Sequence, residues 1–289
     1  MDAVARIEAC LEAAIDNAIA KPCPPVLAKA VHYSVFPGGA RVRPQLCVSV
    51  ASACNADDEA IVDGAAAAIE LLHCASLVHD DLPCFDDAET RRGRYSVHKL
   101  YGEPIAVLAG DALIVEAFNT IARTSVRNPE RMAKLISSVA NAVGMPNGIV
   151  AGQAWESEPN IDVHKYHRAK TGSLFVGAVT AGAMAAGENP APWCPLGQLV
   201  GEAYQMADDL LDAAGSLGEG GKPLAQDDAC NRPNAVERYG VDGVLKMLKQ
   251  TVKEAADSIP PCDGADELRS LIIAQATRLV PAKLAKSAA

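Results

Sequence analysis

Apolar side chains recur along this chain at spacings of three and four residues, which is the period of an amphipathic α-helix. Alternation of single apolar and polar residues, the mark of a strand, is nowhere convincing, and no repeat of about 20–50 residues is present. The pattern therefore predicts an all-α protein. The predicted helices cover approximately residues 3–20, 25–34, 43–53, 58–81, 104–123, 130–144, 163–187, 195–213, 234–258 and 264–286.

Several predicted helix boundaries coincide with residues that start or stop helices. Pro104 opens one helix, Asn128 and Pro129 precede another, and Gly240 interrupts a third. No linker changes composition enough to divide the chain. We therefore expect a single domain, residues 1–289, with about ten helices around a central cavity.

Composition supports a helical fold and narrows the function. Of 289 residues, 49% are hydrophobic but only 4% are aromatic, so Ala, Val, Leu and Ile carry most of the apolar content, and Ala is the best helix former. The net charge of −10 argues against non-specific nucleic-acid binding, which needs a basic surface. An anionic substrate remains possible if metal ions and arginines reverse the local field.

Targeting and redox signals are weak. Nine cysteines form no CxxC pair, and their odd number suggests neither a zinc site nor a disulfide framework. Residues 1–21 have the pattern of an amphipathic helix with acidic residues, not of a signal peptide. The longest weakly polar run, residues 174–187, is too short to cross a bilayer. We expect a reduced cytoplasmic protein without a membrane span.

Three aspartates lie within one apolar helical segment, residues 204–214. On a helix, Asp208 and Asp212 share a face, and their like charges repel each other. Acidic clusters on helices are usually solvated surface, so this motif alone is a weak signal. A second acidic cluster upstream makes a functional interpretation stronger.

The upstream cluster ends an apolar helix. Asp80 and Asp81 close that helix, and Pro83 cannot continue it, so the chain is expected to turn and bring Asp86 back. Carboxylates so placed are costly unless cations hold them. Ligands made only of carboxylates suit Mg²⁺, which binds a few carboxylates together with substrate phosphates. Neither cluster contains His, so zinc and di-iron sites are not indicated.

Arginines flank the first cluster in sequence. Arg91 and Arg92 follow it, and Arg41 and Arg43 precede it. Arginine forks match phosphate oxygens, so the combination predicts a diphosphate clamp.

A P-loop is the rival phosphate-binding motif, within residues 215–223. It fails because Ser216, not Gly, lies six residues before Lys222, and Pro223 occupies the position of the required Ser or Thr.

Over nearly the whole chain, these motifs resemble the trans-prenyl diphosphate synthases. Each motif alone is weak, but their shared order is specific. The stretches HCASLVHDDLPCFDD and NRPNAV are most similar to geranylgeranyl diphosphate synthases of bacterial carotenoid and bacteriochlorophyll pathways. Between the two aspartate motifs, the matching residues are Arg91-Arg92-Gly93, Ala109-Gly110-Asp111, Gly152-Gln153, Lys170-Thr171-Gly172 and Tyr204-Gln205.

The resemblance implies a prenyl synthase fold, a homodimer, and condensation of isopentenyl diphosphate with an allylic diphosphate. The allylic diphosphate ionises to a cation, the double bond of isopentenyl diphosphate attacks it, and a proton is lost. Three Mg²⁺ ions would neutralise the departing diphosphate. Their ligands would be Asp80, Asp81, Asp86, Asp208, Asp209 and Asp212.

The resemblance also assigns the remaining site residues. The allylic diphosphate would be bound by Arg91, Lys170 and Lys222. Isopentenyl diphosphate would be bound by Arg43, His73 and Arg92. The catalytic set would be Lys170, Thr171 and Gln205, of which the last two direct oxygen dipoles at the cation.

Simpler interpretations exist for some of these residues. A single His in an apolar helix is often a core residue, but the seven-residue spacing of His73 from Asp80 places both on one face. Lys170 and Lys222 would be ordinary surface lysines without the surrounding motifs. Tyr204 is better explained by packing than by chemistry.

Three positions depart from the family pattern. Ala40 stands where the family usually has Lys, and Gln226 and Arg232 each replace another Lys. The missing cations would weaken substrate binding, or would indicate a non-catalytic regulatory subunit. Such a subunit would be expected to lose aspartates first. All six are present, so an active enzyme is predicted.

Small residues beneath the first motif bear on product length. Ala75 and Ser76 lie about 6–7.5 Å down the helix from Asp80. Farnesyl synthases with this type of motif commonly place an aromatic plug at the first of these positions, so its absence favours a C20 product over C15. Alternatively, Ala75 only packs against a neighbouring helix, and another residue, such as Phe118, sets the floor.

Overall fold

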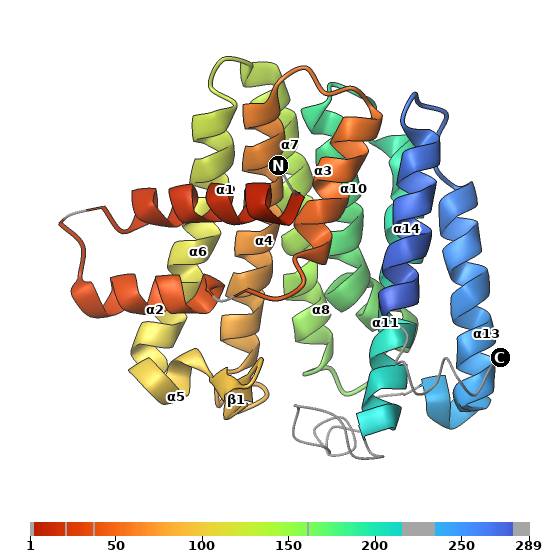
Figure 1. The fold of residues 1–289 in the computed structure, drawn as a ribbon. Coiled ribbons are helices and arrows are strands. Elements are labelled where there is room, and N and C mark those ends of the chain that lie inside the picture. Colours follow the sequence, from red (N-terminus) through yellow and green to blue (C-terminus); the bar gives the residue numbers. More distant parts are fainter. Residues whose placement is uncertain (1–2, 21, 37, 161, 216–234, 280–289) are drawn as a thin grey trace. The chain divides into compact units, whose positions relative to one another are not determined.

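The computed structural model describes residues 3–20, 22–36, 38–160, 162–215 and 235–279, and most of them are helical (Figure 1). The predicted all-α class is confirmed. In chain order the helices are α1 (Ala3–Ala18), α2 (Pro25–Val35), α3 (Val42–Ala53), α4 (Glu59–Asp80), α5 (Val97–Tyr101), α6 (Glu103–Thr124), α7 (Pro129–Val143), α8 (Ile149–Trp155), α9 (Val163–His167), α10 (Ser173–Ala185), α11 (Cys194–Gly215), α13 (Ala235–Asp257) and α14 (Ala265–Leu279).

The chain packs as two compact units. The first comprises Met1–Asn141 and Gly177–Pro190, and the second comprises Ala142–Val176 and Ala191–Ala289. Helix α10 contributes its first residues to the second unit and the remainder to the first. A single domain around a central cavity therefore stays a prediction.

In the first unit, α4 is the central helix and lies alongside α6 (Figure 1). A cap starts α4, because the Asp58 carboxylate accepts from the backbone N–H groups of the first turn. Gly64 at one end of α4 faces Thr124, and Gly110 on α6 faces His79 at the other end; a Cβ at either glycine would overlap that neighbour. These contacts set the close approach of the two helices and explain the glycine of the Ala109-Gly110-Asp111 motif.

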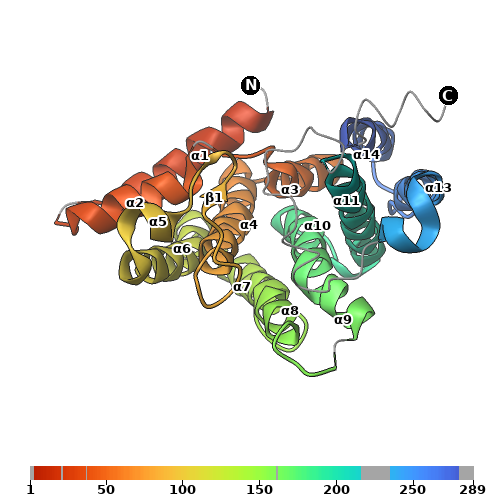
Figure 2. The ribbon, with the colours of Figure 1, turned by 90° about the horizontal axis from the view of Figure 1, so that it is seen from below.

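In the second unit, α11, α13 and α14 lie side by side (Figure 2). Small and branched apolar residues form the core between the first two of these helices: Ala203, Ala207, Leu210, Val244, Leu245 and Leu248. Helix α13 is kinked at Gly240, whose φ of 68° and ψ of 167° suit only glycine. The predicted interruption at Gly240 is confirmed.

The long predicted helices are present, and the misses are short or irregular elements. Segment 88–102, which lies between two predicted helices and was assigned no helix, contains α5 and a two-stranded hairpin, β1 (Thr90–Arg91) and β2 (Arg94–Tyr95). Helix α8 was also missed, because a segment of 7 residues is too short to show a helical period. The prediction of one helix over 163–187 was wrong, since a π-helical turn, η1 (Arg168–Gly172), separates α9 from α10.

Two helices of the described residues, α4 and α6, are long and apolar enough to match a membrane span by length and composition. Core helices of other proteins match equally well. The apolar window of α4 is 78% buried within the structure, so its composition is explained by packing against its neighbours.

Candidate functional site

The first aspartate motif forms a tight turn at the end of α4. Asp80 is the last helical residue, and its carbonyl oxygen accepts a 3.0 Å hydrogen bond from the backbone N–H of Asp86. The backbone N–H of Ala88 bonds to the carbonyl of Asp81 at 3.1 Å. The chain thus returns to the helix end, as the position of Pro83 predicted. Asp80 and Asp86 are both half-buried there.

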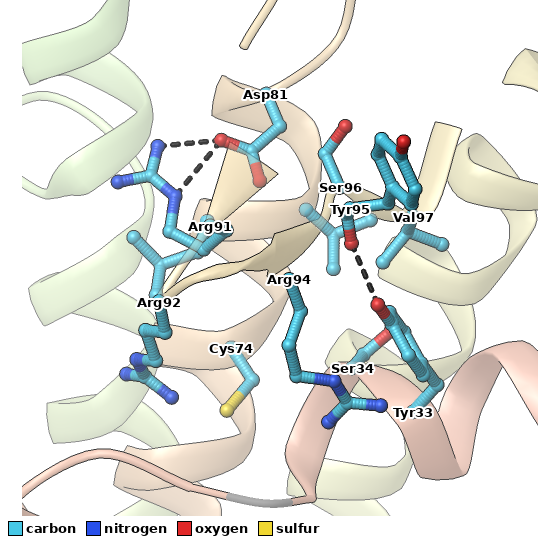
Figure 3. A pocket seen from close by; sticks show the side chains of 12 residues that line it. Tyr33, Ser34, Cys74, Asp81, Arg91, Arg92, Arg94, Tyr95, Ser96 and Val97 are labelled. Atoms are coloured by element: carbon cyan, nitrogen blue, oxygen red, sulfur yellow. Dashed lines mark hydrogen bonds and ion pairs between the residues drawn. The ribbon is translucent and has the colours of Figure 1, made fainter. Parts of the chain in front are cut away.

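Asp81 differs from these two aspartates. It is only 2% exposed, and its Oδ1 accepts from Nε of Arg91 at 2.9 Å and also from Nη2 of the same guanidinium (Figure 3). Burial raises the pKa of the Asp81 carboxyl, and the hydrogen bonds from Arg91 oppose that rise without cancelling it. Asp81 therefore anchors the loop that carries Arg91.

That loop is the hairpin of β1 and β2. Its two turn residues, Arg92 and Gly93, have φ of 54° and 73°, the left-handed pair that a two-residue hairpin turn requires. On the far strand, the Arg94 guanidinium lies 3.9 Å from the ring centroid of Tyr33 in α2 (Figure 3). The hairpin is thus held to α4 through Arg91 and to α2 through Arg94. A cavity of about 50 Å³ lies between these elements.

The three residues assigned to isopentenyl diphosphate lie around one loop. Nη1 of Arg43 is 3.3 Å from Nε2 of His73, and the Arg92 guanidinium lies 2.9 Å from where a Cβ on Gly39 would be. Burial, and then the charges of neighbouring arginines, lower the pKa of His73 well below its ordinary value. A neutral His73 ring can accept a hydrogen bond from Arg43, so the structure brings this predicted set together.

The two residues assigned to product length occupy successive positions on α4. Ala75 is 1% exposed, so it is compatible both with a product-length role and with simple packing. Ser76 is half-buried, and its hydroxyl donates to the carbonyl oxygen of His73 at 2.8 Å. Phe118 on α6 is also half-buried.

The second aspartate motif lies on α11, and its members differ in the same way. Asp208 and Asp212 are half-buried and four residues apart on one helical face. Asp209 is 7% exposed; its Oδ1 accepts from Nε2 of Gln205 at 3.0 Å and its Oδ2 from the backbone N–H of Ala235 at 2.9 Å. Asp209 therefore ties α11 to the first residue of α13, a role that sequence reasoning missed.

The predicted pair of cation-facing residues is also present. Oγ1 of Thr171, in η1, donates to Oε1 of Gln205 at 3.0 Å. A hydrogen-bonded chain thus runs from Thr171 through Gln205 to Asp209. Tyr204 packs against Phe175 with ring centroids 5.1 Å apart, in agreement with a packing role.

Lys170 has a partner that the sequence interpretation missed. Its Nζ donates to Oε1 of Glu156 at 2.7 Å, and the Tyr166 hydroxyl donates to the same oxygen at 2.6 Å. Nε2 of Gln153 lies 3.3 Å from the other oxygen of Glu156. Gly152 packs against the backbone of Lys170, where a Cβ would overlap it. One sequence signal could have pointed to Glu156. It lies three residues after Gln153 of the Gly152-Gln153 motif, a spacing that brings two side chains together on a helix.

Lys222, Gln226 and Arg232 lie outside the described residues, so one allylic diphosphate ligand and two departures remain predictions. Ala40, the third departure, is exposed, and its carbonyl oxygen accepts from Nε2 of Gln45 at 2.6 Å.

The donor chemistry of both clusters fits Mg²⁺ arriving with a substrate. Among the described residues, no three His, Cys, Asp or Glu side chains are grouped closely enough to bind a metal alone. Mg²⁺ commonly takes one or two carboxylates and completes its octahedron with phosphate oxygens and water. Asp80 with Asp86, and Asp208 with Asp212, supply such oxygen donors.

Comparisons with known proteins agree with these motifs. The family model described as polyprenyl synthetase matches residues 24–258. Geranylgeranyl diphosphate synthase of Cereibacter sphaeroides is 51% identical over 280 residues, covering 97% of each chain, and that of Rhodobacter capsulatus is 51% identical over 267 residues, covering 92% of each. The crystal structure of a geranyltransferase from Legionella pneumophila aligns with a TM-score of 0.79 at 25% identity, covering 96% of this chain and 94% of that one.

Two aspartates of α11 have different proposed roles: Asp209 anchors α13, and Asp212 is a metal ligand. Their replacement should therefore change the free energy of unfolding by different amounts. Asp209→Asn leaves either Gln205 or the Ala235 N–H facing a donor, so we expect the free energy of unfolding to fall by about 1–3 kcal/mol. Asp212→Asn relieves repulsion from Asp208 and should change stability by less than about 1 kcal/mol. Urea denaturation of both variants measures the difference, and equal effects would contradict the assignment.

Proposed function

Because the chain belongs to the polyprenyl synthetase family, we propose that it is a geranylgeranyl diphosphate synthase. It condenses isopentenyl diphosphate head-to-tail with the allylic diphosphates dimethylallyl, geranyl and farnesyl diphosphate. The observation that carries this proposal is the 51% identity to two geranylgeranyl diphosphate synthases over nearly full length. The cytoplasm is the proposed location.

Mg²⁺, three ions per site in this proposal, supplies charge neutralisation for the departing diphosphate. The sequence analysis predicts six aspartate ligands for the ions, and four of them are half-buried: Asp80, Asp86, Asp208 and Asp212. The other two, Asp81 and Asp209, are buried and hydrogen-bonded, so we propose that each also fixes the loop or helix beside the ions.

Cationic side chains bind the two diphosphates. Arg91, together with Lys170 and Lys222, binds the allylic diphosphate. In the described structure Lys170 is paired with Glu156. When the substrate binds, Lys170 would leave the Glu156 carboxylate and pair with a diphosphate oxygen. The neutral His73, with Arg43 and Arg92, binds isopentenyl diphosphate, and Thr171 and Gln205 place oxygens near the allylic cation.

Two alternatives have support of their own. A farnesyl synthase would share every metal and diphosphate ligand, and differs only in the depth available beneath the first motif. A non-catalytic regulatory subunit is suggested by Ala40 and Gln226, which lack expected cations. Retention of all six aspartates favours the enzyme.

A homodimer is the proposed assembly. Helix α6 exposes Val107, Leu108 and Val115 at 41%, 50% and 68%, an apolar row on a helix whose opposite side packs on α4. Burying this row against a second copy would remove it from water. Light scattering on the purified protein should give twice the mass of one chain, and a monomer would contradict this proposal.

The activity itself is tested with purified protein, Mg²⁺, isopentenyl diphosphate and each allylic primer. We expect a C20 product, no turnover after Mg²⁺ removal by a chelator, and a fall in kcat on the order of 10²-fold for Asp86→Asn. Asp57→Asn, which removes an exposed carboxylate paired with Arg131, should leave kcat unchanged. A C15 end product would favour the farnesyl alternative, and no turnover with any primer would favour the regulatory subunit.

Product length is tested at Ala75. Replacing it with Phe introduces an aromatic ring about 7.5 Å down α4 from Asp80, so the main product should shorten from C20 to C15. Leu at this position should give a mixture. An unchanged C20 product from a folded Ala75→Phe variant, measured by chromatography of the dephosphorylated prenols, would exclude Ala75 as the determinant.

A further inference from the structure

Arg41 is the only arginine of the described residues whose side chain is entirely buried. It is also the residue before α3, with φ of 51° and ψ of 35°, in the left-handed region. A side chain with a Cβ is strained in that conformation, and such strain persists where surrounding contacts fix the residue. The contacts of Arg41 therefore need an explanation.

One guanidinium joins three helices. Nε of Arg41 donates to Oε1 of Glu8 in α1 at 2.8 Å, and Nη1 donates to Oε1 of Glu70 in α4 at 2.7 Å. Nη2 donates to the carbonyl oxygen of Val35, the last residue of α2, at 2.8 Å. Burial disfavours the charge, but the hydrogen bonds that Arg41 donates to both glutamates, with the negative charge of Glu70, outweigh it and raise the pKa of Arg41 above its ordinary value.

The loop fixed in this way carries the groups that face isopentenyl diphosphate. The Arg41 guanidinium lies against Gly38, and the next residue, Gly39, lies against the Arg92 guanidinium. Two residues after Arg41, Arg43 reaches His73, which is three residues along α4 from Glu70. A shift of Arg41 would therefore displace Arg43 relative to His73 and disturb the packing of Gly39 against Arg92.

Arg41 itself does not bind the substrate. Its side chain has no exposed surface, and its nitrogens already face two carboxylates and a carbonyl oxygen. It therefore does not replace the cation missing at Ala40. Since Ala40 supplies no charge, Arg43 is the one cation that this segment offers to the substrate. Its position therefore matters more for binding than it would if a lysine at position 40 shared the role.

We propose that Arg41, held by Glu8 and Glu70, is a positioning residue that sets Arg43 and Arg92 for binding isopentenyl diphosphate. This inference rests on the proposed function. A merely structural role, docking α1 on α4, is the competing explanation. The chain offers a matched control, because Arg6 and Asp63 form a second ion pair between the same two helices at 2.6 Å, away from the loop.

The test compares Glu8→Gln with Asp63→Asn in the full-length protein. Glu8→Gln keeps the shape of the contact but removes its charge, so we expect the KM for isopentenyl diphosphate to rise about 10-fold, since small misplacements of binding groups are costly. The KM for the allylic diphosphate and kcat should stay within about twofold of wild type. Asp63→Asn, which also breaks an α1–α4 ion pair, should leave all three constants unchanged.

A second variant guards against loss of folding. Arg41→Lys keeps the charge but cannot reach both glutamates and the Val35 carbonyl, so it should lower Tm and, assayed well below that Tm, show the same selective rise in KM. Equal rises in KM for both substrates, the same effect from Asp63→Asn, or an unchanged KM in Glu8→Gln would each overturn the inference.

The proposed function is judged separately, on the wild-type protein. If the wild type makes no prenyl product but binds isopentenyl diphosphate, the proposed function fails. The inference is then decided by calorimetric titration of Glu8→Gln with isopentenyl diphosphate. A Kd about 10-fold above that of the wild type supports it, and an unchanged Kd overturns it. If the wild type does not bind isopentenyl diphosphate at all, both fail.

Discussion

Helix α4 and the residue that follows it carry two buried carboxylates, Glu70 and Asp81, and a buried charge is tolerated only with a well-placed partner. Each has an arginine from a loop: Arg41 from the segment before α3, and Arg91 from the hairpin after α4. The requirement to neutralise these two acids fixes both loops against one helix. Asp80 and His73 lie beside these two loops: the turn that leads to the hairpin bonds to the Asp80 carbonyl, and Arg43, two residues after Arg41, reaches His73.

In both aspartate motifs, one aspartate is buried and the other two are half-buried. Asp81 and Asp209 are buried and hydrogen-bonded within the protein, whereas their neighbours are half-buried. A row of similar acids in sequence thus contains two physical kinds. The buried member in each motif holds the chain, and the half-buried members are the ones that we propose bind a hard cation together with diphosphate oxygens.

Long helices and the turn after α4 were predictable, because they depend on local periodicity and on Pro83. The partners of Asp209 and Lys170 were not. Asp209 bonds to the backbone of Ala235, 26 residues later, and Lys170, within a π-helical turn, bonds to Glu156, so both contacts depend on packing that no local pattern encodes. The resemblance supplied a list of site residues, and the geometry adds which two of the six aspartates are buried and hydrogen-bonded within the protein.

The glycine at position 110 has a consequence for how this protein can vary. It admits the His79 ring, whose Nε2 lies 3.2 Å from the carbonyl oxygen of Val107, on the exposed row of α6. His79 immediately precedes Asp80. An inherited change at Gly110 would therefore alter an external helix face and the proposed metal-binding end of α4 at once, which couples the variation of these two surfaces in descendants of this sequence.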